Sequence, residues 1–150
     1  MRFLCDHMLG SLARWLRFMG YDTAYPKPIS DRELAALART EERILVTRDK
    51  ELAARVSGAI QIRSDVLEEQ IREVAAVLPL RPVDPLSRCS LCNTVLEPAT
   101  IDDVMERVPE GVRSRHLNFW RCRTCGRIYW QGTHWDKMIE RLNNLNLPRA

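Results

Sequence analysis

This 150-residue sequence lacks any apolar run that approaches the length of a membrane-spanning helix. Its first residues do not form the basic, apolar and small-residue succession of a secretory signal. Neither internal repeats nor low-complexity tracts occur. We therefore expect a cytoplasmic protein without a membrane partner, and a chain of this length is expected to form one domain or two small ones.

A strong net charge is also absent, because 23 basic and 20 acidic side chains nearly cancel to +3. The content of hydrophobic residues, 45%, and of charged residues, 29%, is ordinary for a globular protein. The charge is nevertheless uneven, since the segment 107–127 contains six arginines and a single acidic residue, Glu110. A local basic patch of this kind says more about binding than the total charge does.

Cysteines are few, and their spacing does not fit a disulfide framework. Four of the five form two Cys-x-x-Cys pairs, Cys89 with Cys92 and Cys122 with Cys125, and at this spacing both thiolates of a pair can bind one tetrahedral Zn²⁺. Four thiolates complete the coordination of zinc, so we expect a structural zinc site and keep redox or iron chemistry as the alternative. Cys5 lies in an apolar run and is expected to be a small buried hydrophobe.

Strand and helix patterns alternate in the first half of the chain. Short β-branched and apolar runs predict strands at 2–5, 23–25, 44–47 and 59–62. Helical patterns predict a helix over 8–19, a second that begins at a capping box at Ser30, a third that follows the strand 44–47 and ends at residue 56, and a fourth over 67–78. Four such alternations favour an α/β fold in which a parallel sheet carries helices on both faces.

Acidic residues stand at the ends of two expected strands and at the start of one expected helix. Asp6 follows the first strand, Asp49 follows the strand 44–47, and Asp31 is the first residue of the helix after Ser30. Each one alone is explained as well by a helix cap, or by the preference for negative charge at a helix N-terminus, as by a catalytic role. Together they favour a Mg²⁺ or Mn²⁺ site, because the carboxyl ends of parallel strands open into one crevice and these ions prefer oxygen ligands.

Three prolines predict a stiff, extended linker over 79–88, so that residues 1–78 form one domain and residues 89–150 a smaller lobe. A lobe of roughly 60 residues needs a staple such as a metal to hold its fold. We expect the second cysteine pair to close a hairpin, with a short helix at 101–107 before it and a final helix at 135–145 after it.

Arginines and aromatic residues interleave around the second cysteine pair. Guanidinium groups bind phosphates, and aromatic rings stack on unpaired bases. We therefore expect Arg121, Arg123 and Trp120 to contact nucleic acid. The alternative is that alternate residues of the hairpin pack inward and the arginines only solvate its outer face.

Motifs along the whole chain resemble one family. They are DHMLG at 6–10, LARWLR at 12–17, GYD at 20–22, DREL at 31–34, TRD at 47–49, the two Cys-x-x-Cys pairs, and IYWQGTHW at 128–135. Together they resemble a PIN-like ribonuclease family named after the C-terminal part of a mutator-class 3′–5′ exoribonuclease, which joins a PIN-like domain to a zinc ribbon.

The resemblance implies a Rossmann-like PIN fold followed by a small zinc-ribbon lobe, and metal-dependent hydrolysis of RNA. It implies Asp6, Asp31 and Asp49 as the metal-binding acids. PIN domains generally have one acid more, and Asp65, after the last expected strand of the first half, is the candidate for it, with Glu33 as its competitor.

Two functions are therefore carried forward. The first is a ribonuclease for single-stranded or structured RNA that uses Mg²⁺ or Mn²⁺, in which Arg14, Arg17 and Arg48 orient the phosphate backbone. Arg14 and Arg17 lie off the apolar stripe of the first helix, on a flank expected to face solvent or a ligand. The second is a non-catalytic RNA-binding or adapter module with a degenerate acidic site.

Overall fold

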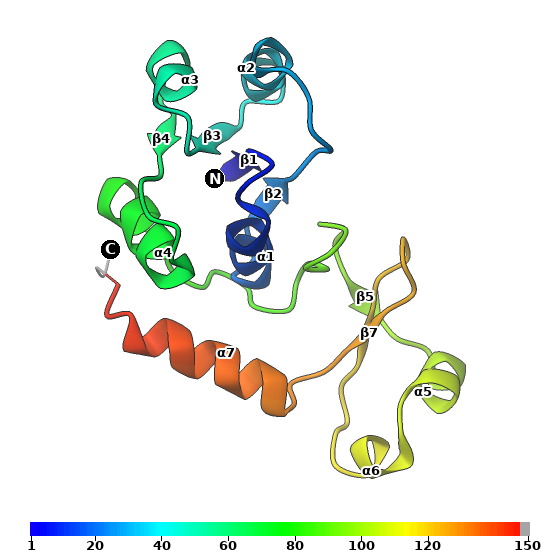
Figure 1. Cartoon of the computed structure of the whole chain (residues 1–150). Helices are drawn as coiled ribbons and strands as arrows, with labels where there is room; N and C mark the ends of the chain where they lie inside the picture. Colours follow the sequence, from blue (N-terminus) through cyan, green and yellow to red (C-terminus); the bar gives the residue numbers. More distant parts are fainter. Residues whose placement is uncertain (148–150) are drawn as a thin grey trace.

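The computed structural model describes residues 1–147 and is drawn in Figure 1. Its first half alternates strand and helix as the sequence predicts: β1 (Arg2–Cys5), α1 (Gly10–Phe18), β2 (Asp22–Ala24), α2 (Asp31–Thr40), β3 (Ile44–Thr47), α3 (Lys50–Arg55), β4 (Ile60–Gln61) and α4 (Leu67–Val77). The four strands form one parallel sheet in the order β2-β1-β3-β4. The predicted α/β class is thus confirmed. Among the described helices, none combines the length and the apolar character that crossing a membrane requires.

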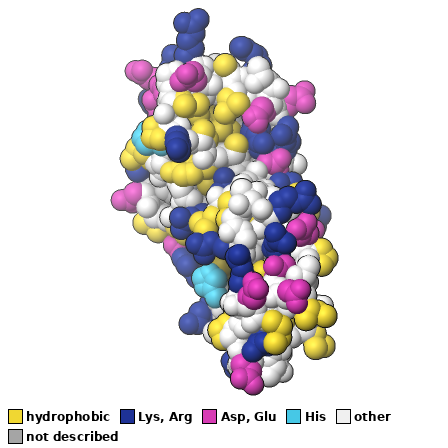
Figure 2. Space-filling view, turned by 90° about the vertical axis from the view of Figure 1, so that its right-hand side faces the viewer, with side chains coloured by type: hydrophobic (Ala, Val, Ile, Leu, Met, Phe, Trp, Pro, Cys, Tyr) yellow, Lys and Arg dark blue, Asp and Glu magenta, His cyan; other side chains and the backbone are white. Residues whose placement is uncertain are grey.

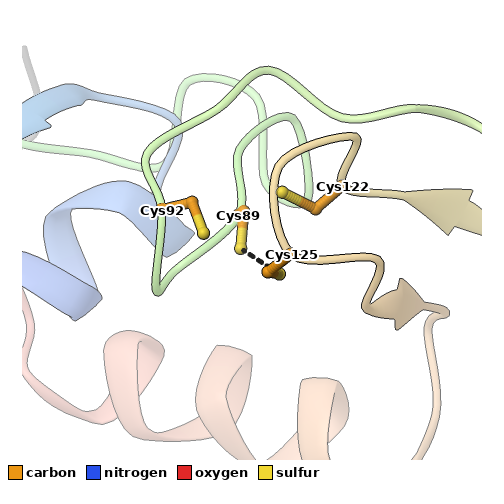
Figure 3. A group of neighbouring side chains, drawn as sticks. All are labelled: Cys89, Cys92, Cys122 and Cys125. Atoms are coloured by element: carbon orange, nitrogen blue, oxygen red, sulfur yellow. Dashed lines mark hydrogen bonds between the residues drawn. The ribbon is translucent and has the colours of Figure 1, made fainter.

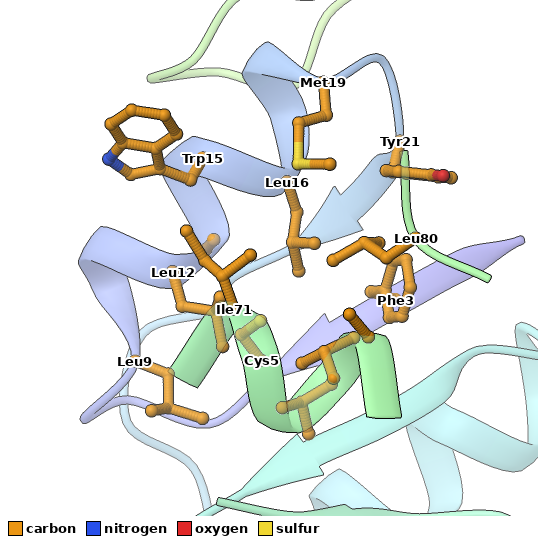
Figure 4. Close-up of a cluster of buried hydrophobic side chains, with 14 of the residues drawn as sticks. Phe3, Cys5, Leu9, Leu12, Trp15, Leu16, Met19, Tyr21, Ile71 and Leu80 are labelled. Atoms are coloured by element: carbon orange, nitrogen blue, oxygen red, sulfur yellow. The ribbon is translucent and has the colours of Figure 1, made fainter. Parts of the chain in front are cut away.

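The central strands of this sheet are buried on both faces. Phe3 and Cys5 of β1 pack into a core with residues of α1 and α4, whereas Leu4 between them packs into a second core with residues of α2 and α3. Successive side chains of a strand point to opposite faces, so a strand covered on both sides needs apolar residues in a row. Figure 4 shows the larger core, where Leu16 of α1 and Ile71 of α4 pack with the side chains of β1.

The proline-rich segment 79–88 packs against the first half, and its role as a linker stays a prediction. Leu80 is fully buried in the larger core. The backbone N–H of Asp84 donates to the carbonyl of Met19, at 3.4 Å. Gly20 permits this approach, because it has φ +101° and a Cβ there would lie 2.8 Å from the Asp84 nitrogen.

The second half contains β5 (Glu97–Pro98), α5 (Ile101–Arg107), α6 (Glu110–Arg113), β6 (Trp120–Arg121), β7 (Ile128–Tyr129) and α7 (Thr133–Asn144). Its three short strands form an antiparallel sheet in the order β5-β6-β7. The predicted hairpin is present as β6 and β7 and carries the second cysteine pair between its strands. The predicted helices at 101–107 and 135–145 are also present, and the latter begins two residues earlier as α7.

Helix α7 lies across the first half, alongside α1 and α4 (Figure 1). Leu142 and Leu145 are buried in the larger core. The Arg141 guanidinium stacks over the Trp15 ring of α1, 4.9 Å from its centroid, and pairs with Glu68 of α4. The division into domains at residue 89 stays a prediction, since the end of the second part packs on the first.

Candidate functional site

The three aspartates singled out in the sequence line one pocket at the carboxyl edge of the parallel sheet. Its volume is about 360 Å³. The lining residues are Asp6, His7, Met8, Asp31, Arg48 and Asp49. They come from the ends of β1 and β3 and from the starts of α2 and α3, the edge at which ligands bind in open α/β sheets.

Asp6 is the most enclosed of the three acids, with 8% of its surface exposed. One carboxylate oxygen accepts a hydrogen bond from the Thr47 hydroxyl at 2.8 Å, and the other accepts one from the His7 backbone at 2.7 Å. The Thr47 hydroxyl also accepts from the backbone N–H of Asp49 at 3.0 Å. Thr47 therefore fixes the distance between the loops that carry two of the acids. The sequence carries a signal for this role, since Thr47 is the polar residue that ends an apolar run.

Asp49 is a helix cap as well as a pocket residue. Its Oδ1 accepts hydrogen bonds from the backbone N–H groups of Glu51 and Leu52, at 2.9 and 3.1 Å. These bonds occupy one oxygen and hold the carboxylate in place, while Oδ2 forms no hydrogen bond within residues 1–147. The two roles considered for this acid are therefore compatible.

Asp31 does not cap its helix, because Ser30 does so. The Ser30 hydroxyl accepts from the Glu33 backbone N–H at 3.1 Å, and the Glu33 carboxylate accepts from the Ser30 backbone N–H at 2.8 Å. Asp31 is left half-exposed, 3.5 Å from the Arg55 guanidinium. Glu33 is used in the capping box, and Asp65 is exposed; neither lines the pocket.

The acids share a pocket without forming a closed ligand set. Within residues 1–147, the group of three or more potential ligand side chains close enough to hold one ion is the four cysteines, not the aspartates. Mg²⁺ usually keeps several water molecules and is held by one or two carboxylates together with substrate phosphates. An open arrangement of this kind can bind such an ion through water, and does not enclose it.

The four paired cysteines meet at one point, as the sequence predicts (Figure 3). Their sulfurs all lie within 4.8 Å of one another, and those of Cys89 and Cys125 are 3.8 Å apart. Zinc–sulfur bonds of ~2.3 Å place the sulfurs of a tetrahedral site about 3.8 Å apart. The donor set and its spacing therefore fit one metal ion such as zinc.

The two cysteine loops have the same backbone design. In the first, the N–H of Asn93 donates to the carbonyl of Cys89 at 2.8 Å, and in the second the N–H of Gly126 donates to the carbonyl of Cys122, also at 2.8 Å. Asn93 and Gly126 both adopt a left-handed conformation, with φ +66° and +78°. Asn and Gly are the residues that accept this conformation most readily.

Backbone and side-chain donors surround the sulfurs. Burial raises the pKa of the Cys122 thiol, but the backbone N–H groups of Cys125 and Thr124 outweigh burial and lower this pKa to about 7. The thiolate is the metal-binding form of cysteine, so the lowered pKa of Cys122 favours metal binding, whereas burial raises the pKa of Cys125 and Cys92. The Tyr129 hydroxyl lies 3.0 Å from the sulfur of Cys89. By contrast, burial raises the pKa of the Cys5 thiol to about 12, consistent with its expected role as a small hydrophobe.

Arg17 ties the first cysteine loop to the parallel sheet. Its side chain is buried, with Nε donating to the Thr23 carbonyl at 2.8 Å and Nη1 donating to the carbonyls of Ser90 and Leu91 at 3.0 and 3.1 Å. The expectation that Arg17 faces solvent or a ligand is therefore wrong. Periodicity alone could not show that a loop more than 70 residues away covers this flank of α1.

Asn93 makes the reciprocal connection. Its Oδ1 accepts from the Thr23 backbone N–H at 3.0 Å, and its Nδ2 donates to the Asp22 carboxylate at 2.7 Å. Burial would raise the pKa of Asp22, but the hydrogen bonds from Asn93 and Arg43 outweigh burial and hold this pKa below its usual range. We call this set of contacts, made by Arg17 and Asn93 to Asp22 and Thr23, the β2 clamp.

The other residues predicted to contact RNA lie in different surroundings. Arg48 lines the acidic pocket, and Arg14 is exposed on α1. Arg121 lies 3.5 Å from Asp103, Arg123 lies 2.9 Å from Glu97, and Trp120 of β6 is half-buried. Figure 2 shows Lys and Arg side chains gathered over the middle of one face of the molecule, with acidic side chains among them.

The fold and its sites define a class of protein: an α/β sheet with an acidic pocket at its carboxyl edge, followed by a segment whose four thiols can hold a metal ion. The chain belongs to the Mut7-C RNAse domain family, whose family model matches residues 1–142. This confirms the family resemblance seen in the sequence and indicates a ribonuclease-type function that acts on RNA. Searches among curated proteins and among solved structures gave no match.

Proposed function

We propose that the protein is a divalent-metal-dependent ribonuclease that hydrolyses single-stranded RNA in the pocket of Asp6, Asp31 and Asp49. The observation that supports this most directly is that acids from three separate segments line one pocket at the sheet edge. Family membership supports the ribonuclease function independently. The parallel sheet with its acidic carboxyl edge is in keeping with a PIN-like fold.

The residues of the pocket suit this chemistry. Mg²⁺ or Mn²⁺, when bound, would lower the pKa of a water molecule and neutralise charge at the scissile phosphate. Thr47 and the backbone of His7 hold the carboxylate of Asp6, and the start of α3 holds that of Asp49. These groups are therefore positioned before substrate arrives. Arg48 supplies a positive charge for phosphate within the same pocket.

The second lobe would hold RNA and leave the cleavage to the first. Zinc on the four cysteines stabilises the lobe, and Arg121, Arg123 and Trp120 offer phosphate and base contacts on the hairpin. Arg14 would extend the phosphate contacts along α1. We place this activity in the cytoplasm, where cysteines remain reduced and available to a metal.

Asp49→Asn tests the proposal. The amide keeps the shape and the helix-capping oxygen of Asp49 but removes its charge. We expect cleavage of single-stranded RNA in Mg²⁺ or Mn²⁺ to be abolished, while RNA binding stays near the wild-type level. The matched variant Asp65→Asn decides whether Asp65 is a fourth acid, because this residue is exposed and lies outside the pocket lining. Activity that survives in both Asp49→Asn and Asp6→Asn would refute the proposal.

One observation favours the adapter function. The aspartates do not form a group close enough to hold an ion directly, in contrast to the four cysteines in the same described part of the chain. If the protein is an adapter, it binds RNA and shows no metal-dependent cleavage. Isothermal titration with Mn²⁺ separates the two functions, since a nuclease should lose a binding event on Asp49→Asn and an adapter should have none to lose.

A further inference from the structure

An exposed methionine stands inside the acidic pocket. Met8 is 61% exposed, whereas Asp6 and Leu9 on either side of it are 8% and 1% exposed. Met8 lines the pocket together with the three aspartates. The other lining residues are acidic, basic or a histidine, so Met8 is the residue of this lining that can contact an apolar part of a ligand.

The turn that carries Met8 is held in place. The backbone N–H of Leu9 donates to the carbonyl of Asp6 at 2.9 Å and closes the turn. The Tyr25 hydroxyl donates to the carbonyl of His7 from the other side. Gly10 makes room for this ring, because a Cβ at position 10 would lie 3.0 Å from the Tyr25 oxygen. Met8 is thus presented to the pocket by a fixed backbone.

The substrate named in the proposed function has one part that suits Met8. In a nucleotide the phosphate is charged and the ribose is polar, and these groups match the acids with their cation and Arg48. The base has an apolar face, and a thioether makes favourable contacts with aromatic rings. The faces of bases are covered by stacking in a duplex, whereas single strands can splay them out.

We infer that Met8 packs on the face of an unpaired base next to the scissile phosphate and so makes the pocket selective for single-stranded RNA. This inference rests on the proposed function, since it assumes that the phosphate lies at the aspartates. It assigns Met8 to substrate selection, separate from the charged groups that would act on the phosphate.

The test uses a labelled oligoadenylate in which one central nucleotide is abasic. All phosphates of the parent oligomer are chemically alike, so a gel that resolves cleavage by position compares the abasic position with its neighbours in one reaction. For the wild type we expect cleavage at the abasic position to be slower by about two- to tenfold, the range that corresponds to sulfur–aromatic contacts. Met8→Ala should slow cleavage at the ordinary positions by the same factor and should no longer distinguish the abasic one.

Two variants serve as controls. Met8→Leu keeps an apolar side chain of similar size and should retain most of the discrimination. Val77→Ala removes an equally exposed apolar side chain, 64% against 61%, from the end of α4 outside the pocket lining, and should behave as the wild type. The inference is overturned if Met8→Ala cleaves at the wild-type rate, or if it slows all positions and still distinguishes the abasic one.

A binding arm separates this inference from the proposed function. Fluorescence anisotropy of the same oligomers with Asp49→Asn and with Asp49→Asn/Met8→Ala needs no cleavage. We expect Met8→Ala to weaken binding of the intact oligomer at the pocket and to leave a fully abasic one unchanged. If the wild type cleaves no RNA, the proposed function fails, and the binding difference still decides the role of Met8.

Discussion

Asn93→Gly removes one half of the β2 clamp and leaves the cysteine loop intact. Glycine tolerates the left-handed backbone of this position, φ +66°, and the second loop already has Gly126 at the equivalent place. The metal site should therefore form as before. What disappears is the side-chain amide that accepts from the Thr23 N–H and donates to the Asp22 carboxylate.

The loss can be estimated from these two bonds. A hydrogen bond to a neutral group contributes about 1 kcal/mol to stability and one to a charged group about 1.5–3 kcal/mol. Both bonds are only partly buried, so water replaces part of what is lost. We expect the free energy of unfolding to fall by about 2 kcal/mol. For a chain of this length that corresponds to a lowering of Tm by roughly 4–8 °C.

Thermal unfolding of the zinc-loaded protein measures this change, with the zinc content determined in parallel. Asn146→Gly is the matched control, because Asn146 also has positive φ, +52°, is exposed, and has no side-chain hydrogen bond within residues 1–147. It reports the cost of added backbone freedom alone. Equal losses of stability in the two variants would refute the reasoning, and so would loss of zinc from Asn93→Gly.

Three further predictions concern the metal, pH and RNA. Cys125→Ser should lose the metal, and hydrogen exchange should then speed up in the segment 89–130 and also at the Thr23 amide, which the β2 clamp protects. Folding lowers the pKa of Asp22 below its value in the unfolded chain, which is about 3.9. The stability that Asp22 contributes is therefore present above about pH 3.9 and is lost as the pH falls through the pKa of the folded protein. Asp22→Asn should accordingly be less stable than wild type at pH 7 and flatter in a pH series of urea unfolding below pH 4; parallel curves would contradict this. Arg123→Ala should weaken RNA binding and reduce the salt slope by roughly one unit, and an unchanged slope would move the RNA surface elsewhere.

Local patterns predicted the local features of this fold. The apolar run 44–47 could only be a strand covered on both faces, and the capping box at Ser30 formed as its sequence requires. The cysteine spacing was sufficient to identify the metal cluster, since two residues between thiols fix the loop that brings them together. The parallel topology followed from alternation, and it in turn brought the acids to one edge.

Contacts between distant segments could not be predicted in this way. The flank of α1 that carries Arg17 has the polar character of a solvent-facing surface, and only the fold shows that carbonyls of the first cysteine loop cover it. The apolar stripe of α7 predicted a helix but not its partner, which is the core of the first half. The partners of the Thr47 hydroxyl, the Asp6 carboxylate and the Asp49 N–H, could not be predicted for a related reason, because a threonine suits a strand whether or not its hydroxyl has a function.

The β2 clamp has a consequence for dividing this chain. Strand β2 is the outer strand of the parallel sheet, and both the N–H and the C=O of Thr23 point away from β1 toward Asn93 and Arg17. These are the groups with which a further strand would pair, and Asn93 of the first cysteine loop and Arg17 of α1 occupy them in its place. A fragment that stops at residue 78 would leave the Thr23 N–H open and would lose the loop carbonyls that hold Arg17. An open strand edge is a template for pairing with another chain. The first cysteine loop therefore shields this edge of the parallel sheet from pairing with another chain.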